Sequence, residues 1–90
     1  MNFAVVWNPS ATVPIDDAWV AAAKNEQEDI ALALGRIQSR LSGDPEGCGE
    51  SRSNTSTRVF TERPVTVHFR IIARLNLVRV FAARVYRRRA

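Results

Sequence analysis

The sequence predicts an α+β domain in which two helices cover one face of a small, mainly antiparallel sheet. Three observations lead to this prediction. A short β-branched and aromatic run opens the chain, two stretches with helical apolar spacing follow, and the last third alternates between apolar and polar residues. With 90 residues the chain is expected to form one domain over 1–90, and its 46% hydrophobic and 24% charged content is typical of a globular protein.

The chain is expected to begin with a strand that leads into a helix. Residues 2–7 (NFAVVW) favour a strand, which Pro9 ends. A first helix is predicted to open at Pro14, with Thr12 as a possible cap and the acidic pair 16–17 in its first turn. One apolar helical face then collects Ile15, Trp19, Ala22 and Ala23.

A second helix is predicted directly after the first. Asn25 followed by Glu28 forms a capping-box pattern, and Gly43 with Pro45 ends the helix. Between these signals an apolar stripe with helical spacing contains Ile30, Ala33, Leu34, Ile37 and Leu41. The short break between the two helices implies an antiparallel helical hairpin.

Three strands are predicted after a loop. The loop covers Asp44–Thr55, which is rich in Gly, Pro, Ser, Asn and Glu. The strands are Thr57–Glu62, Pro64–Ile72 and Leu77–Tyr86, and the turn Ala73–Asn76 joins the last two. The sheet face turned away from the helices then carries Thr66, His68, Arg70 and Arg79 and is open to a partner.

The phase of the last strand depends on one irregularity. Val78, Val80 and Ala82 alternate with Arg79, Phe81 and Ala83. If that alternation continues, Arg84 falls on the apolar face unless a bulge intervenes.

Charge is distributed unevenly along the chain. Residues 1–50 hold three basic and eight acidic side chains, whereas residues 51–90 hold ten arginines and one acid, Glu62. The basic half is expected to bind a polyanion or an acidic protein, although arginine-rich solvated strands are the simpler interpretation. A single cysteine, Cys48, cannot close an internal disulfide, which favours a reducing compartment. No apolar run is long enough to span a membrane, and the N-terminus lacks the pattern of a signal peptide.

Several local signals follow one another in an order that resembles a known family. They are the strand running into Asn8-Pro9, the helical hairpin with Trp19, Asp44-Pro45, Gly49-Glu50-Ser51-Arg52, Arg58, the run 63–71 (RPVTVHFRI) and a valine-rich closing strand. Together they resemble the RelE/ParE superfamily of bacterial toxins, which belong to type II toxin–antitoxin and plasmid-stabilisation systems. The resemblance covers nearly the whole chain.

The resemblance implies a cytoplasmic toxin held inactive by a small acidic antitoxin encoded beside it. RelE-like members are mRNA interferases that cut mRNA in the ribosome without a metal, whereas ParE-like members act on DNA gyrase. Some relatives have no demonstrated activity. Whether this chain is an enzyme therefore stays open. If it is one, it is expected to be a metal-independent, RNA-binding endoribonuclease without a cofactor. Its partners would be the ribosome and mRNA, or alternatively DNA gyrase. No association with a membrane is expected.

Metal-free RNA cleavage needs a base for the ribose 2′-OH, cations for the phosphate and an acid for the leaving 5′-oxygen. Following the resemblance, Glu50 or His68 is the candidate base, Arg58 and Arg87 the candidate phosphate clamp, and Tyr86 a stacking group or proton donor. Further phosphate contacts are expected from Arg52, Arg70, Arg79 and Arg88.

The chain also departs from the family's pattern. RelE-like nucleases place an arginine near the start of the third strand, where this chain has Thr66, and no lysine follows Lys24. Either neighbouring arginines substitute, or the nuclease activity is absent; a ParE-like function needs no catalytic constellation.

Structural interpretations stand beside the functional ones. Glu50 can be a solvated loop residue, His68 a structural strand residue, and 87–89 a solvated basic tail or an antitoxin contact. The single histidine argues against a zinc site. Trp7 and Trp19 are expected in the core, and Cys48, between glycines, is expected to be exposed.

Overall fold

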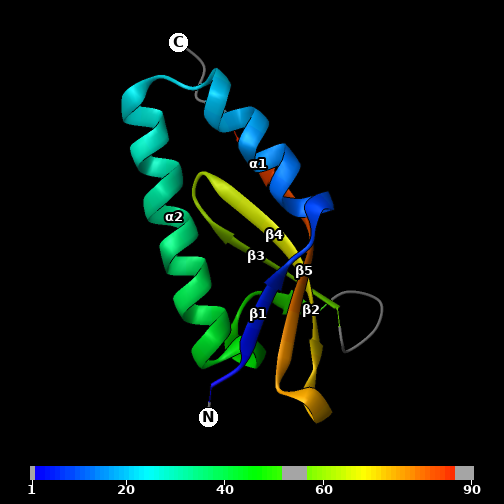
Figure 1. Cartoon of the computed structure of the whole chain (residues 1–90). Coiled ribbons are helices and arrows are strands. Elements are labelled where there is room, and N and C mark those ends of the chain that lie inside the picture. The colour runs from blue at the N-terminus through cyan, green and yellow to red at the C-terminus, as the bar shows by residue number, and fades with distance from the viewer. Residues whose placement is uncertain (1, 52–56, 87–90) are drawn as a thin grey trace.

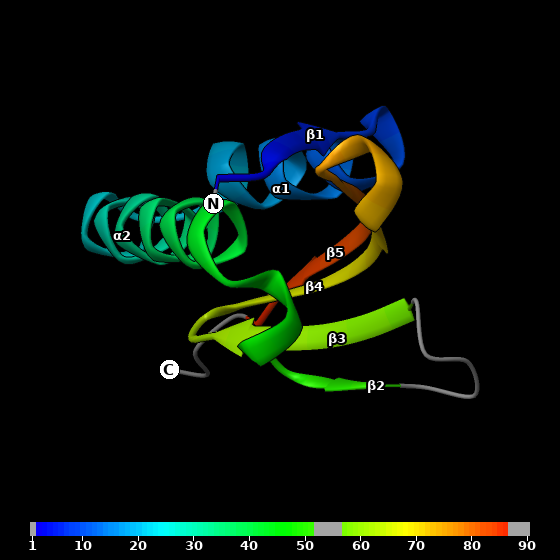
Figure 2. The same ribbon diagram turned by 90° about the horizontal axis from the view of Figure 1, so that it is seen from below.

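A computed structural model describes residues 2–51 and 57–86. A five-stranded sheet runs in the order β1-β5-β4-β3-β2, with β1 parallel to β5 and the other pairs antiparallel. The strands are β1 (Ala4–Trp7), β2 (Glu50–Ser51), β3 (Thr57–Glu62), β4 (Val65–Ile72) and β5 (Leu77–Val85). The helices α1 (Pro9–Ala21) and α2 (Lys24–Gly43) lie on one side of the twisted sheet (Figures 1 and 2). The predicted α+β arrangement of strand, helical hairpin and three antiparallel strands is confirmed.

The helix α1 begins at Pro9, five residues before the predicted start at Pro14. The reason is that proline fits the first helical position, where its missing N–H loses no hydrogen bond. The carbonyl of Asn8 accepts hydrogen bonds from the amides of Ala11 and Thr12, so Thr12 lies within the helix instead of capping it. Pro14 and the acidic pair 16–17 consequently lie inside the helix.

The buried stripe of α1 is the predicted one, but its buried part is shifted toward the N-terminus. Ala11 and Ile15 are buried, whereas Trp19 is 38% exposed, so the prediction that Trp19 belongs to the core is wrong. The sequence pattern began at Ile15 and therefore missed Ala11. Trp7 is half-buried against the core, and its indole N–H donates to Gln38 Oε1 on α2 at 2.9 Å.

The helix α2 begins at Lys24, close to the predicted start, but its cap is shifted. The backbone N–H of Ala23 donates to Glu26 Oε1 at 2.9 Å, so Glu26 takes the acceptor role predicted for Glu28. The predicted apolar stripe packs on the sheet. Its members Ile30, Ala33, Ile37 and Leu41 are buried, and Leu34 is half-buried.

The segment after α2 folds back under the sheet. A short 3₁₀ turn, η1 (Pro45–Gly47), precedes β2, which pairs with β3. This turn buries Cys48 completely, and its Sγ lies 3.1 Å from the carbonyl oxygen of Asp44. The prediction of an exposed Cys48 is therefore wrong. Burial raises the pKa of the Cys48 thiol, because the interior disfavours the thiolate.

The strands β4 and β5 meet through a hairpin and one bulge. The hairpin passes through η2 (Ala73–Leu75) and Asn76, whose φ of 50° is left-handed, in agreement with the predicted turn. In the ladder, His68 pairs with Ala82 and Phe69 pairs with Val80, so Phe81 is the extra residue. The bulge reverses the alternation of β5 after Phe81 and places Arg84 on the sheet face away from the helices.

Candidate functional site

The sheet surface turned away from α1 and α2 is called here the open face. Paired residues of an antiparallel ladder point to the same side, so the register identifies its members. They are Thr57, Val59 and Thr61 on β3, Thr66, His68, Arg70 and Ile72 on β4, and Leu77, Arg79, Phe81, Ala82 and Arg84 on β5. These residues include three arginines and a histidine but no carboxylate. Among the described side chains the open face is therefore cationic.

Two arginines of the open face stand opposite each other. Arg70 pairs with Arg79 across β4 and β5, and both side chains are exposed. Like charges at directly opposite positions destabilise a sheet. An anion bound between the two guanidinium groups would remove this repulsion, and the planar forks of arginine suit phosphate oxygens.

His68 lies at the centre of the open face. It pairs with Val59 on one side and Ala82 on the other, and its side chain is half-buried. The imidazole meets the ring of Phe81 with 6.2 Å between ring centroids and an interplanar angle of 62°. The backbone of Glu50 pairs with Val59, which places Glu50 in the same row, roughly 10 Å from His68 at the usual spacing between strands.

A third group surrounds Thr66. Its hydroxyl is 2.7 Å from that of Thr61, and the residue is 6% exposed. Arg84 pairs with Thr66 across the ladder, and its Cζ atom lies 5.4 Å from the centroid of the exposed Tyr86 ring. Arg84 was not among the candidate site residues predicted from the sequence, because its side of the sheet depends on the bulge in β5. The arginine missing at Thr66 thus has a neighbour that can substitute for it.

Arg58 lies apart from these residues. It pairs with Phe69, a core residue, and its Nε atom is buried without a hydrogen-bond partner. Its position is thus on the helix-covered side of β3, close enough to Cys48 to lower the pKa of that thiol against the larger effect of burial. The expected grouping of Arg58 with the phosphate-binding arginines of the open face is therefore not what the fold produces.

The other candidates are placed less completely. Arg52, Arg87 and Arg88 lie outside the described residues, and Glu50 is placed by its backbone pairing alone. The structure therefore brings together His68, Arg70 and Arg79, with Arg84 in the next row on the other side of His68 and Tyr86 two residues beyond Arg84.

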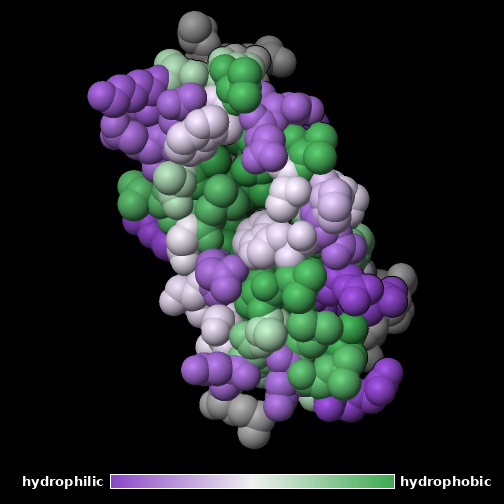
Figure 3. All heavy atoms as spheres, in the orientation of Figure 1, coloured by the Kyte–Doolittle hydropathy of each residue, from purple (hydrophilic) through white to green (hydrophobic). Residues whose placement is uncertain are grey.

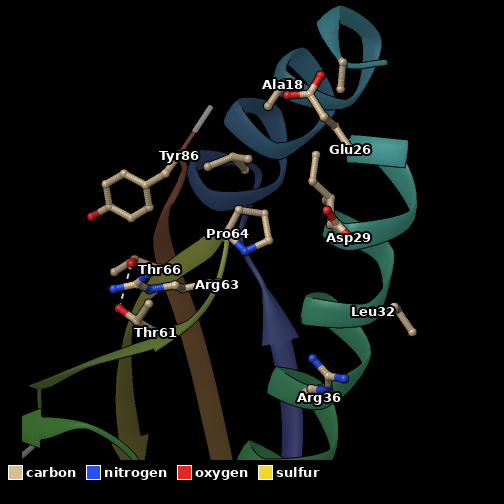
Figure 4. A pocket seen from close by; sticks show the side chains of 13 residues that line it. Ala18, Glu26, Asp29, Leu32, Arg36, Thr61, Arg63, Pro64, Thr66 and Tyr86 are labelled. Carbon is tan, nitrogen blue, oxygen red and sulfur yellow. Dashed lines mark hydrogen bonds between the residues drawn. The ribbon is translucent and has the colours of Figure 1, made fainter. Parts of the chain in front are cut away.

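A cleft of about 600 Å³ opens between the helical hairpin and the β3–β4 turn (Figure 4). Its walls include the apolar side chains of Ala18, Ala22, Ile30, Leu32, Pro64 and Val85. Charged side chains of both signs, Glu26, Asp29, Arg36 and Arg63, also contribute. Tyr86 borders this cleft and the open face alike. In the space-filling view, hydrophobic residues gather between α1 and α2, with charged residues around them (Figure 3).

The described part of the chain holds neither a metal-binding cluster nor a membrane-crossing helix. No group of three or more His, Cys, Asp or Glu side chains gathers there in a way that could hold a metal ion. No helix within these residues has the length and apolar character needed to cross a membrane.

The fold is similar to that of solved bacterial toxins. A chain in the structure of the RelBE2 toxin–antitoxin complex of Mycobacterium tuberculosis aligns with 96% of this chain and over 93% of its own length, with 14% sequence identity and a TM-score of 0.71. A chain of the chromosomal ParDE system of P. aeruginosa aligns with 94% of this chain and over 97% of its own length, with 17% sequence identity and a TM-score of 0.68. A mutant of the E. coli toxin RelE in the free state aligns with 94% of this chain and over 84% of its own length, with 12% sequence identity and a TM-score of 0.64. No protein-family model and no curated protein matches the sequence.

Proposed function

From the RelE/ParE fold of this chain, we propose that the protein is the toxin of a type II toxin–antitoxin pair and cleaves mRNA in the ribosome without a metal. The observation that supports this proposal is the open face itself. Its described side chains hold His68 between the Arg70–Arg79 pair and Arg84. Counterion release then favours a polyanion over a neutral partner.

The chemistry assigns one role to each part of the open face. The ribose 2′-OH gives its proton to His68 Nδ1 or Nε2, and its oxygen attacks the adjacent phosphorus. Arg70 and Arg79 hold the phosphate oxygens whose negative charge grows in the transition state. The bond to the 5′-oxygen breaks, leaving a 2′,3′-cyclic phosphate, and Tyr86 either donates the proton to the 5′-oxygen or stacks on a base. Glu50 is the alternative base, and its backbone lies in the same row as His68.

The cognate partner proposed is an acidic antitoxin. Two of the similar structures are toxin–antitoxin complexes. The cleft between the helical hairpin and the β3–β4 turn combines apolar walls with charged side chains of both signs, and Tyr86 joins it to the cationic open face. An acidic segment with one apolar side could fill the cleft and neutralise the arginines together.

A second candidate function is inhibition of DNA gyrase or binding without catalysis. Thr66 favours it, because its hydroxyl is bonded to Thr61 and the residue is buried, so no cation stands at that position. Arg58, on the helix-covered side, does not contribute a charge to the open face either. A ParE-like inhibitor would use the open face as a protein-binding surface.

Controlled expression in a bacterial host tests these proposals. Growth and RNA 5′ ends are followed together for the wild type and for the variants H68Q, R70Q and R79Q, with R36Q as the control. Arg36 is also an exposed arginine, but it lines the cleft proposed for the antitoxin and not the open face, so in cells without antitoxin R36Q leaves the proposed RNA-binding surface unchanged. Growth arrest with new ends inside translated codons, lost in H68Q and retained in R36Q, is the expected result.

Other results separate the alternatives. Growth arrest with DNA damage and intact mRNA would contradict the proposed nuclease and support inhibition of gyrase. The absence of arrest with soluble wild-type protein would mean that this fold serves binding alone.

A further inference from the structure

The β-bulge lies directly beside His68. The ladder pairs His68 with Ala82 and Phe69 with Val80, so Phe81 has no partner on β4. Two consecutive side chains of β5, Phe81 and Ala82, therefore reach the open face.

The bulged residue contacts two other parts of the molecule. Its ring meets His68 in the edge-to-face range, at 6.2 Å and 62°. Its carbonyl oxygen accepts a hydrogen bond from Ser10 Oγ at 2.6 Å. The preceding carbonyl, of Val80, accepts from the backbone N–H of Asn8 at 2.9 Å. The beginning of α1 thus holds two consecutive carbonyls of β5 at the bulge.

From this chain of contacts we infer that Ser10 and Phe81 are positioning residues that fix the imidazole of His68 through the bulge. The inference rests on the proposed function, in which His68 is the base. Proton transfer requires the accepting nitrogen within hydrogen-bond reach of the 2′-OH, so the orientation of the ring affects the rate. The Phe81 ring limits rotation of the imidazole, and the Ser10 hydroxyl holds the backbone that carries Phe81.

The geometry separates this role from RNA binding. Ser10 belongs to α1, whereas Arg70 and Arg79 lie on the open face one row beyond Phe81. Loss of the Ser10 hydroxyl should therefore alter His68 without removing a phosphate contact. His68 is the single histidine of the chain, so its ring signals in an NMR spectrum need no assignment among several residues.

The test compares S10A, S10T and F81L with S39A in the full chain. Ser39 is an exposed serine on α2, far from the bulge, and serves as the control. Three quantities are measured: the NOE between the His68 and residue-81 side chains with the His68 ring shifts, the affinity for a short single-stranded RNA, and single-turnover cleavage of mRNA in programmed ribosomes. Urea unfolding verifies that each variant is folded.

In S10A we expect shifted His68 ring signals, a weaker NOE to Phe81 and cleavage slowed roughly 10- to 100-fold, with RNA affinity within twofold of the wild type. S10T keeps a hydroxyl and should restore the wild-type values, F81L should resemble S10A, and S39A should change nothing.

Unchanged His68 signals in both S10A and F81L would overturn the inference, as would a loss of cleavage that only follows RNA affinity. His68 signals that move in S10A and recover in S10T, in a protein whose wild type cleaves no RNA, would support the positioning role and overturn the proposed nuclease instead.

Discussion

The α-carbon of Gly49 packs against the backbone carbonyl oxygen of Val59, at the point where the chain enters β2. A β-carbon at position 49 would collide with this oxygen, and the φ of 65° there is one that other residues rarely adopt. The pairing of Glu50 with Val59, which places Glu50 in the row of His68, begins at this contact.

Gly49→Ala is therefore expected to lower the free energy of unfolding by about 1–3 kcal/mol, because both strain and collision act on the folded state. Gly35→Ala is the matched control. Gly35 lies exposed in α2 with open space where a β-carbon would stand, so this substitution should stabilise the protein by about 0.5–1 kcal/mol. Urea unfolding of the two variants measures both effects, and equal changes in the two would contradict this account.

Neutralising one arginine of the Arg70–Arg79 pair should stabilise the fold and weaken RNA binding. R70Q removes the repulsion across β4 and β5, which is expected to raise the free energy of unfolding by about 0.2–1 kcal/mol. It also removes a phosphate contact, so the affinity for RNA falls and depends less steeply on salt.

A double-mutant cycle isolates the coupling between the two guanidinium groups. Once Arg70 is neutral, R79Q has no repulsion left to relieve and should add little stability. Fluorescence anisotropy at several salt concentrations gives the RNA affinities, and R36Q is the control. Additive gains from the two substitutions would show that the arginines do not interact.

The buried Cys48 thiol makes the stability depend on pH. Its pKa in the folded state is raised by burial above the ordinary value of 9.0, so the folded protein keeps this proton at a pH where the unfolded chain has lost it. The unfolded state then binds fewer protons, and the free energy of unfolding decreases as the pH rises above about 9.

Urea unfolding between pH 7 and 10 should show this decrease in the wild type and a smaller one in Cys48→Ala. The thiol should also react slowly with alkylating reagents in the native protein and rapidly after unfolding, because it is 0% exposed. Rapid native labelling would contradict the burial.

Glu26 should contribute more to stability than Glu28. The Glu26 carboxylate accepts the backbone N–H of Ala23 at the start of α2, and a negative charge there also suits the helix dipole. E26A is expected to lower the free energy of unfolding by about 0.5–1 kcal/mol. Glu28 is exposed near the start of the same helix, so E28A should have a smaller effect on the free energy of unfolding. Thermal unfolding of E26A and E28A compares the two losses. A larger loss in E28A would restore the cap at Asn25 predicted from the sequence.

Strict alternation explains why β4 could be predicted. Val65, Val67 and Phe69 alternate with polar residues, so the open-face positions of His68 and Arg70 follow from the sequence. In β5, the arginine at position 84 indicated that a bulge could intervene, but a period of two does not locate the extra residue, so its position at Phe81 came only from the structure.

Other misses have equally local causes. The face of Arg58 depends on how β3 pairs with β4 through the turn at Arg63-Pro64, and the residues of β3 (TRVFTE) do not alternate regularly between apolar and polar. Cys48 was misplaced because its glycine neighbours suggested exposure, whereas η1 folds it into the core.

Because the first strand of the sheet pairs with the last one, the sheet cannot be completed during synthesis until the last strand is available. β1 contacts β5 alone among the strands, with Ala4 beside Leu77, and β5 also separates β1 from β4. A nascent chain that has not yet released β5 from the ribosomal tunnel holds a helical hairpin and a β3–β4 hairpin with no strand to join them. Arg79 and Phe81 belong to that last strand. The open face is thus complete only after β5 has left the ribosomal tunnel.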